Sequence, residues 1–158
     1  MAVFRGCDVP DALNYDVERD VWARFETSGD VTLGMTDVAQ TRCGKLVSLR
    51  FKPVGRHVPR GKSLATIESA KWVGPFPAVL GGEIVATNEA AFREDILAAN
   101  KDPYGNGWLV RVRPSDLDNE RAGLVTGAEA VARYRERIER LDAHCYRCSE
   151  EAAPGGPA

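Results

Sequence analysis

Residues 65–77 read Ala-Thr-Ile-Glu-Ser-Ala-Lys-Trp-Val-Gly-Pro-Phe-Pro and place one lysine, Lys71, between an apolar run and a Gly-Pro turn. This order predicts a β-hairpin with Lys71 at its tip. A hairpin tip between packed strands presents an amine on a stiff support, which is what an enzyme that modifies a lysine requires. From these residues alone, an ordinary solvated surface lysine is the alternative.

Short β-type runs punctuated by Gly, Pro, Asn and Asp surround this hairpin from residue 14 to about residue 113. Residues 21–25 and 31–35 predict a second hairpin around a Ser-Gly-Asp turn, and Thr36 is a suitable N-cap for a short helical turn. Residues 44–49 are echoed by residues 82–87. We therefore expect a mainly β domain of two similar halves that close into a flattened barrel, with a strand at 64–67 between them.

Helical patterns occur in two later segments. Residues 88–100 have apolar positions about one turn apart, and they precede an alternating strand at 108–113. From about residue 126 to 148, apolar positions advance by three or four, which predicts one face of a C-terminal helix. This stripe consists of Val131, Tyr134, Ile138, Leu141, Cys145 and Cys148. We expect one domain over residues 1–148 and a disordered, Gly/Pro/Ala-rich tail over 149–158.

Composition excludes several classes of protein. The chain has 158 residues, 44% of them hydrophobic, and a net charge of -2, so nucleic acid is not an expected partner. No apolar run approaches membrane-spanning length and the N-terminus has no leader pattern, so we expect a soluble cytoplasmic protein without a membrane partner. Four cysteines do not make a disulfide scaffold here, and we expect reduced thiols. Cys145 and Cys148 are interpreted as buried helix residues, with dithiol chemistry as the alternative and no metal site.

Four motifs occur in an order that resembles the H protein of the glycine cleavage system, from about Tyr15 to Cys145. They are Glu-Ser-Ala-Lys at 68–71, Gly-Glu at 82–83, Thr-Leu-Gly-Met-Thr-Asp-Val-Ala-Gln at 32–40, and Asn-Lys-Asp-Pro-Tyr-Gly-Asn-Gly-Trp at 100–108. The first resembles the family's lipoylation motif. Each is weak alone, and together they are specific.

The resemblance implies a lipoyl-type barrel-sandwich hybrid fold with short helices and a C-terminal helix. It implies lipoate attached to Lys71, with Glu68 and Ser69 as the rest of the lipoylation motif. It also implies a carrier rather than an enzyme, because the cofactor supplies the reactive sulfurs. The implied partners are a lipoate–protein ligase or lipoyl synthase system, the glycine cleavage enzymes and dihydrolipoyl dehydrogenase. A monomer is expected.

Several departures from the family pattern surround this site. Asp20 stands where the family has the histidine of a His-Glu-Trp motif. The stretch from Arg50 to Arg60 is basic where the family is acidic, and residues 72–77 are bulky and proline-rich. These features are similar to a branch of H-protein-like lipoate-binding proteins that works with a heterodisulfide-reductase-like complex in sulfur oxidation. The arm therefore carries either an aminomethyl group or sulfur.

Two other classes of function compete with the carrier. One is a non-lipoylated binding or regulatory module on the same fold. The other is a thiol-redox protein centred on Cys145 and Cys148. A biotin carrier is disfavoured because Lys71 lies between Ala70 and Trp72, whereas biotinylated lysines usually lie between methionines.

Overall fold

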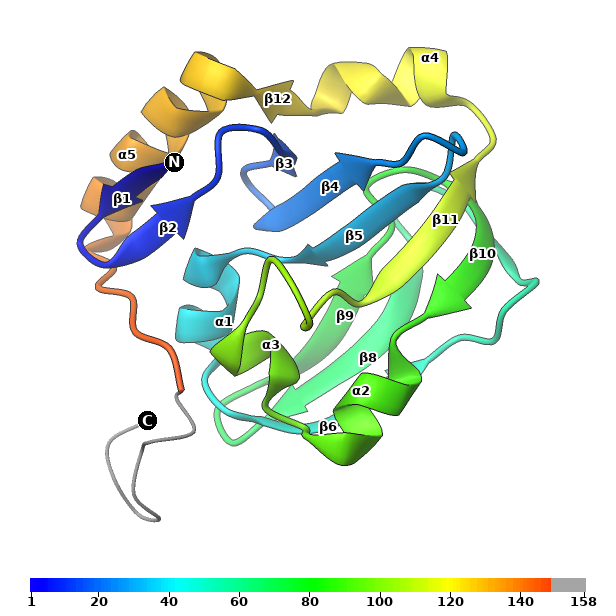
Figure 1. Ribbon diagram of the computed structural model, residues 1–158, viewed down its shortest axis with the longest axis horizontal. Coiled ribbons are helices and arrows are strands. Elements are labelled where there is room, and N and C mark those ends of the chain that lie inside the picture. Colours follow the sequence, from blue (N-terminus) through cyan, green and yellow to red (C-terminus); the bar gives the residue numbers. More distant parts are fainter. Residues whose placement is uncertain (149–158) are drawn as a thin grey trace.

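The computed structural model describes residues 1–148, which form a mainly β structure, as the sequence predicts (Figure 1). The strands are β1 (Ala2–Phe4), β2 (Cys7–Val9), β3 (Asn14–Asp16), β4 (Val21–Phe25), β5 (Val31–Met35), β6 (Leu46–Phe51), β7 (His57–Val58), β8 (Ser63–Ser69), β9 (Val73–Pro77), β10 (Gly82–Thr87), β11 (Val110–Pro114) and β12 (Val125–Thr126). The helices are α1 (Asp37–Cys43), α2 (Glu89–Glu94), α3 (Ala98–Lys101), α4 (Leu117–Glu120), the 3-10 turn η1 (Arg121–Gly123) and α5 (Gly127–Leu141).

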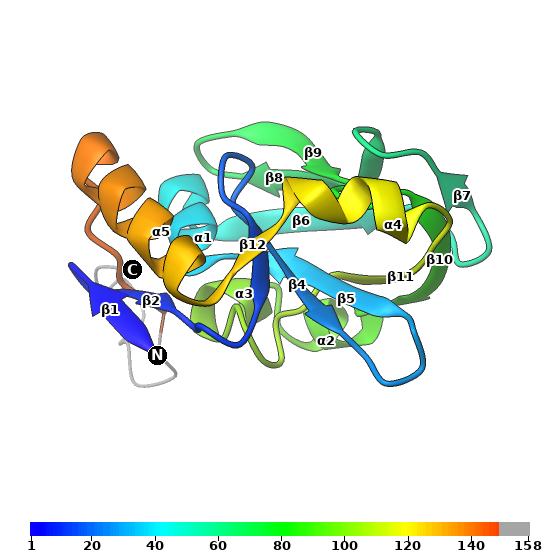
Figure 2. The same ribbon diagram turned by 90° about the horizontal axis from the view of Figure 1, so that it is seen from above.

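Two sheets enclose the main hydrophobic core (Figure 2). The larger has seven strands in the order β12-β3-β4-β5-β11-β10-β7, and the smaller has three in the order β6-β8-β9. Inward side chains from both sheets, such as Leu33, Ile67 and Ile84, are almost fully buried. The echoed stretches form β6 and β10, one in each sheet, and β8 supplies the predicted strand between them.

The local signals around the second hairpin are confirmed. β4 and β5 pair antiparallel from Val21 opposite Met35 to Phe25 opposite Val31. At the end of β5, the Thr36 side chain accepts a hydrogen bond from the Ala39 amide and caps α1. Because an N-cap fixes where a helix begins, α1 starts directly after β5 and runs toward β6. This places the end of α1 beside the hairpin of β8 and β9, as the hydrogen bonds below show.

The helical segment at 88–100 is divided rather than continuous. α2 ends before Asp95, whose carboxylate accepts a hydrogen bond from the Leu97 amide, and α3 then begins. Local bonding of an Asp side chain to the backbone competes with helix continuation, which explains the break.

The C-terminal helix is shorter than the sequence pattern predicts. The apolar stripe continues to Cys148, but α5 ends at Leu141 because Asp142 adopts a left-handed conformation with φ of 50°. Residues 143–148 therefore run as a strap along the molecule. Placing Cys145 and Cys148 on this helix was wrong. Residues 149–158, predicted to be a tail, lie outside the described residues.

A second core joins the N-terminal hairpin of β1 and β2 to α5. Tyr15, Trp22, Tyr134 and Ile138 are its largest fully buried side chains. α5 therefore belongs to the same folded unit as the sheets. Among residues 1–148, no helix is both long and apolar enough to cross a membrane.

Candidate functional site

Lys71 lies in the turn that joins β8 to β9, at one end of the three-stranded sheet (Figure 1). β8 ends at Ser69, β9 begins at Val73, and Glu68 pairs with Val73 across the hairpin. The side chain of Lys71 is exposed. The predicted hairpin with the lysine at its tip is therefore present.

Ser69 holds the shape of this turn. Its hydroxyl accepts hydrogen bonds from the amides of Lys71 (3.2 Å) and Trp72 (3.1 Å) and donates to the carbonyl of Cys43 at 2.7 Å. A backbone bond from the Ser69 amide to the Trp72 carbonyl closes the turn. Ser69 is buried, whereas Glu68 is exposed and accepts a hydrogen bond from Ser48. Of the two motif residues, Ser69 shapes the turn and Glu68 presents a carboxylate beside it.

The end of α1 packs against this turn. Gly44 follows α1 with a φ of +83°, and a Cβ there would lie 3.3 Å from Cε of Lys71. Buried Asn100 donates to the Gly44 carbonyl and accepts from the Leu46 amide, which ties α3 to this junction. A left-handed, close-packed position favours glycine. The lysine stem therefore crosses a bare stretch of backbone.

A pocket of about 430 Å³ opens beside Lys71. Its walls come from α1, the β8–β9 hairpin, residues before β4, and α5. The lining residues are Glu18, Arg19, Asp20, Val21, Met35, Ala39, Arg42, Cys43, Ile67, Lys71, Trp72, Pro75, Phe76, Pro77 and Arg137. An apolar floor with charged groups at the rim is a surface on which a tethered group can rest.

Trp72 lines this pocket and packs against Gly74 of β9. A Cβ on Gly74 would fall 2.0 Å from the Trp72 ring, so the ring lies directly over the glycine. Trp72 is still 45% exposed. The tryptophan after the lysine therefore packs on its own hairpin and keeps one face open to the pocket and solvent.

Comparison with known proteins identifies the family of this chain. The profile described as "Glycine cleavage H-protein" matches residues 13–137. "Glycine cleavage system H protein 2" of Aquifex aeolicus is 46% identical over 142 residues, which span 90% of this chain and 88% of that protein. "Probable glycine cleavage system H protein 2" of Sulfurisphaera tokodaii is 42% identical and covers 93% of this chain and 99% of its own length. The chain belongs to the glycine cleavage H-protein family.

The fold agrees with this assignment. The crystal structure of a glycine cleavage system H protein from Mycobacterium marinum has a TM-score of 0.66 and 31% identity, and covers 80% of this chain and 98% of its own. Members of the glycine cleavage H-protein family are non-catalytic carriers with a covalently attached lipoate. The predicted lipoyl-type fold, the carrier class and the lipoate cofactor are confirmed at the level of the family.

The charge of Asp20 is compensated inside the fold. Asp20 lines the pocket but is buried, and Arg137 of α5 binds it with two hydrogen bonds of 2.9 and 2.8 Å. Tyr134 donates a third, at 3.2 Å. The hydrogen bonds to Asp20 raise the pKa of Arg137. The charge of Asp20 is therefore paired with α5, 117 residues away in the sequence.

Cys43 is a pocket residue that sequence reasoning left aside. It is buried at the end of α1, and burial raises the pKa of its thiol above the ordinary value, against the opposing effects of Ser69 and of the charge on Lys71. Its thiol is therefore protonated at neutral pH and behaves as a small apolar side chain. In the sequence, the only signal for Cys43 is its position as an apolar residue at the end of a short helical pattern.

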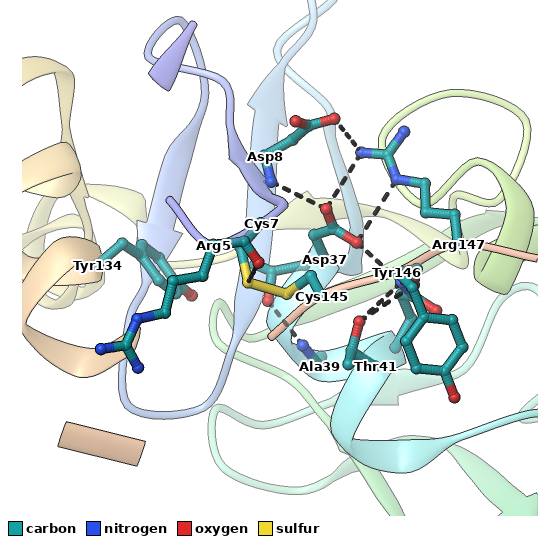
Figure 3. The surroundings of a disulfide bond; sticks show 12 residues. Arg5, Cys7, Asp8, Asp37, Ala39, Thr41, Tyr134, Cys145, Tyr146 and Arg147 are labelled. Atoms are coloured by element: carbon teal, nitrogen blue, oxygen red, sulfur yellow. Dashed lines mark hydrogen bonds and ion pairs between the residues drawn. A yellow bond between two sulfur atoms is a disulfide. The ribbon is translucent and has the colours of Figure 1, made fainter. Parts of the chain in front are cut away.

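The strap after α5 is fastened by a disulfide that the sequence does not predict (Figure 3). Cys145 bonds to Cys7 across 138 residues, so the expectation of reduced thiols was wrong for these two. Left-handed Arg5 and Gly6 turn the chain so that Cys7 meets the strap, and the Arg5 carbonyl accepts from the Cys145 amide. Cys148 is a free, buried thiol. A dithiol centre of Cys145 and Cys148 is therefore contradicted.

Side chains beside the disulfide attach the strap to α1. Arg147 forms an ion pair with Asp8 at 2.6 Å and another with Asp37 at 3.4 Å, while the Tyr146 carbonyl accepts from Gln40 and Thr41 (Figure 3). The strap thus braces the helix that supports the lysine turn. Within residues 1–148, no group of three or more His, Cys, Asp or Glu side chains is placed to hold a metal ion.

Replacement of Ser69 by alanine is expected to lower the free energy of unfolding by about 1–3 kcal/mol, because a buried hydroxyl with three partners is lost. The same change should slow lipoylation, since the turn loses its shape. Urea denaturation and an initial-rate assay with lipoate–protein ligase measure the two effects. Ser48→Ala, which removes one bond to exposed Glu68, is the matched control and should change stability by less than about 0.5 kcal/mol. Equal effects of the two changes would contradict the role given to Ser69.

Proposed function

We propose that this chain is a lipoyl carrier with the arm amide-linked to Nζ of Lys71. The observation that carries the proposal is the turn itself: an exposed lysine on a hairpin fixed by Ser69, beside a pocket of about 430 Å³. A lipoate–protein ligase or a lipoyl synthase system would attach the cofactor. Residues 1–148 would act as one carrier domain in the cytoplasm. The chain would be a monomer, because a mobile arm must visit several enzymes.

In vitro lipoylation tests the attachment site. The wild-type chain, incubated with lipoate, ATP and a lipoate–protein ligase, should gain the mass of one lipoyl group. Lys71→Arg should gain none, and Lys62→Arg, which changes an exposed lysine before β8, should be modified like the wild type. Modification of the Lys71→Arg variant would contradict the proposed site. An unmodified wild-type chain would favour the binding module that lacks lipoate.

For the group that the arm carries, we propose sulfur rather than an aminomethyl group. An aminomethyl cargo is a cation and needs an available carboxylate in the pocket. Of the two lining carboxylates, buried Asp20 is already bound by Arg137, which leaves Glu18. Glu18 is exposed, so water and salt weaken its attraction for a cation. The guanidinium of Arg42 stands 4.0 Å from Asp20 at the same rim. A neutral or anionic sulfur cargo suits this arrangement, and a heterodisulfide-reductase-like complex would then be the partner.

The second candidate is the aminomethyl carrier of glycine cleavage. Its support is the name of the relatives, which are called glycine cleavage system H proteins. In this version the partners are the glycine cleavage enzymes, and in both versions dihydrolipoyl dehydrogenase reoxidises the arm.

Labelled glycine distinguishes the two cargoes. The lipoylated chain, with its arm in the oxidised disulfide form, is mixed with glycine decarboxylase and carboxyl- and methylene-labelled glycine, with an H protein of known activity as the positive control. In glycine cleavage the S–S bond of the arm opens as the aminomethyl group bonds to one sulfur and CO2 leaves. We expect no methylene label on the arm of this chain. Transfer of label at the rate of the positive control would establish the glycine version and contradict the sulfur cargo.

A further inference from the structure

Positive charge is concentrated in the segment that contains the lysine turn and the strands β6 and β8 that lead to it. Residues 45–73 contain seven of the 21 Lys and Arg residues but only one of the 23 Asp and Glu residues, Glu68. The remainder of the chain therefore holds 14 cations and 22 anions. A protein with a net charge of -2 thus consists of a strongly basic segment on an otherwise acidic body. Such asymmetry creates a field that orients the molecule toward a partner of opposite charge.

The cations of this segment are available for binding. We call Lys45, Arg50, Lys52, Arg56, Arg60 and Lys62 the basic segment. All are exposed except Lys52, which is half-buried. Among the ion pairs within residues 1–148, none involves a member of the basic segment. Cations that make no internal pair keep their charge for an external partner.

The basic segment is continuous with the arm site. It begins at the start of β6, where Leu46 pairs with Ser69, and passes Arg50, which lies opposite Thr66 of β8. β6 is an edge strand of the small sheet. Exposed apolar side chains flank the lysine: Val47 is 57% exposed and Val73 63% exposed. An enzyme that receives the arm approaches this end of the sheet and meets the apolar side chains. A partner that extends from there along β6 meets Arg50 and then the cations of residues 52–62, at the opposite end of the sheet.

We propose that the basic segment docks an acidic protein surface at the active-site entrance of the enzyme that accepts the arm, an inference that rests on the proposed carrier function. Charged side chains on an edge strand such as β6 can serve to prevent its pairing with another sheet. That role does not explain Arg56, Arg60 and Lys62, which lie beyond β6. Opposite charges at a rim steer association and select partners. The rest of the chain is acidic and repels the same acidic surface. The molecule therefore approaches the partner with the side that contains Lys71 and the basic segment facing it.

Charge reversal tests this docking. Dihydrolipoyl dehydrogenase from the same host is the probe, and the lipoylated chain is its substrate in an assay of NADH oxidation. The triple variant R50E/K52E/R56E should raise KM by about tenfold or more with little change in kcat, and should flatten the dependence of kcat/KM on salt. The matched control R133E/R135E/R140E makes the same charge change on the exposed face of α5 and should keep KM within about twofold of the wild type.

Two further measurements separate the outcomes. Intact mass shows whether each variant is lipoylated, so a failed carrier function is seen apart from failed docking. Titration of the dehydrogenase with Lys71→Arg chain at low salt reads docking without the arm, and the triple reversal in that background should abolish the signal. Equal KM values for the two triple variants would overturn the proposal. The proposal would also be overturned if the wild-type chain bound duplex DNA or phosphatidylserine vesicles at physiological salt and the R50E/K52E/R56E change abolished that binding.

Discussion

Replacement of Arg137 by glutamine is expected to lower the free energy of unfolding by about 3–5 kcal/mol, because the buried charge of Asp20 would lose its main partner and keep only Tyr134 and a 4.0 Å contact with Arg42. The side chains of Arg137 and Asp20 are only 12% and 8% exposed, and two hydrogen bonds below 3 Å join them. Burial therefore limits how far water can replace the lost partner. Chemical denaturation followed by circular dichroism measures the change.

Two further variants serve as controls for the Arg137→Gln result. Arg135→Gln, on the same helix, breaks an ion pair with Glu139 whose side chains are 66% and 59% exposed, so it should cost less than about 0.5 kcal/mol. Asp20→Asn in the Arg137→Gln background should recover part of the lost stability, because the buried charge is removed. A loss below about 1 kcal/mol for Arg137→Gln, or no recovery in the double variant, would mean that the pair does not hold α5 to the pocket.

Reduction of the Cys7–Cys145 disulfide should lower the free energy of unfolding by about 2–5 kcal/mol, the usual range for a native bridge. The bridge closes a loop with a sequence separation of 138, so its removal frees much of the unfolded chain. We also expect the strap to loosen. Cys148 is buried and its amide bonds to the Asn100 carbonyl, so its alkylation should be slow in the oxidised protein and much faster in the reduced one.

The double variant Cys7→Ser/Cys145→Ser keeps the size of the side chains and should reproduce the effect of reduction under oxidising conditions. Cys148→Ser removes a free thiol and should leave the bridge intact. Denaturation curves with and without a thiol reductant, with mass spectrometry of alkylated peptides, record both properties. Identical curves, and identical alkylation of Cys148 in both states, would contradict a bracing role for the disulfide.

The features that could be predicted from sequence are those encoded within a few residues. The turn at Lys71 follows from an apolar run, a serine and a Gly-Pro pair that lie next to one another. The cap at Thr36 and the β4–β5 hairpin are equally local. The resemblance added the family, which no single periodicity reveals. Local turn and cap chemistry therefore predicted the hairpin that presents Lys71 and the start of α1.

The features that were missed depend on contacts between distant parts of the chain. Asp20 and Arg137, like Cys7 and Cys145, carry no local signal for each other. The end of α5 was misplaced because the apolar spacing continues beyond Asp142 without a glycine or proline. The missed pairs and the misplaced helix end have one cause, because each depends on contacts between segments that lie far apart in the sequence. The ion pair that compensates the charge of Asp20 in the pocket was missed for this reason.

These long-range contacts explain how the lysine turn is kept rigid. The disulfide and Arg147 fasten the strap to the N-terminal hairpin and to α1, and the Cys43 carbonyl at the end of α1 accepts from Ser69. Each link joins segments that the sequence separates. Rigid support of this kind would hold Lys71 in one position while the proposed arm moves.

The proposed attachment of the lipoyl arm to Lys71 can be tested by intact mass and peptide mapping of the protein purified from its native host, without added ligase. We predict one lipoyl group per chain, found on the peptide that contains Glu68, Ser69 and Lys71, and no such group in the Lys71→Arg variant expressed in the same host. A homogeneous unmodified mass in the wild type, or a lipoyl group on another lysine, would contradict the account.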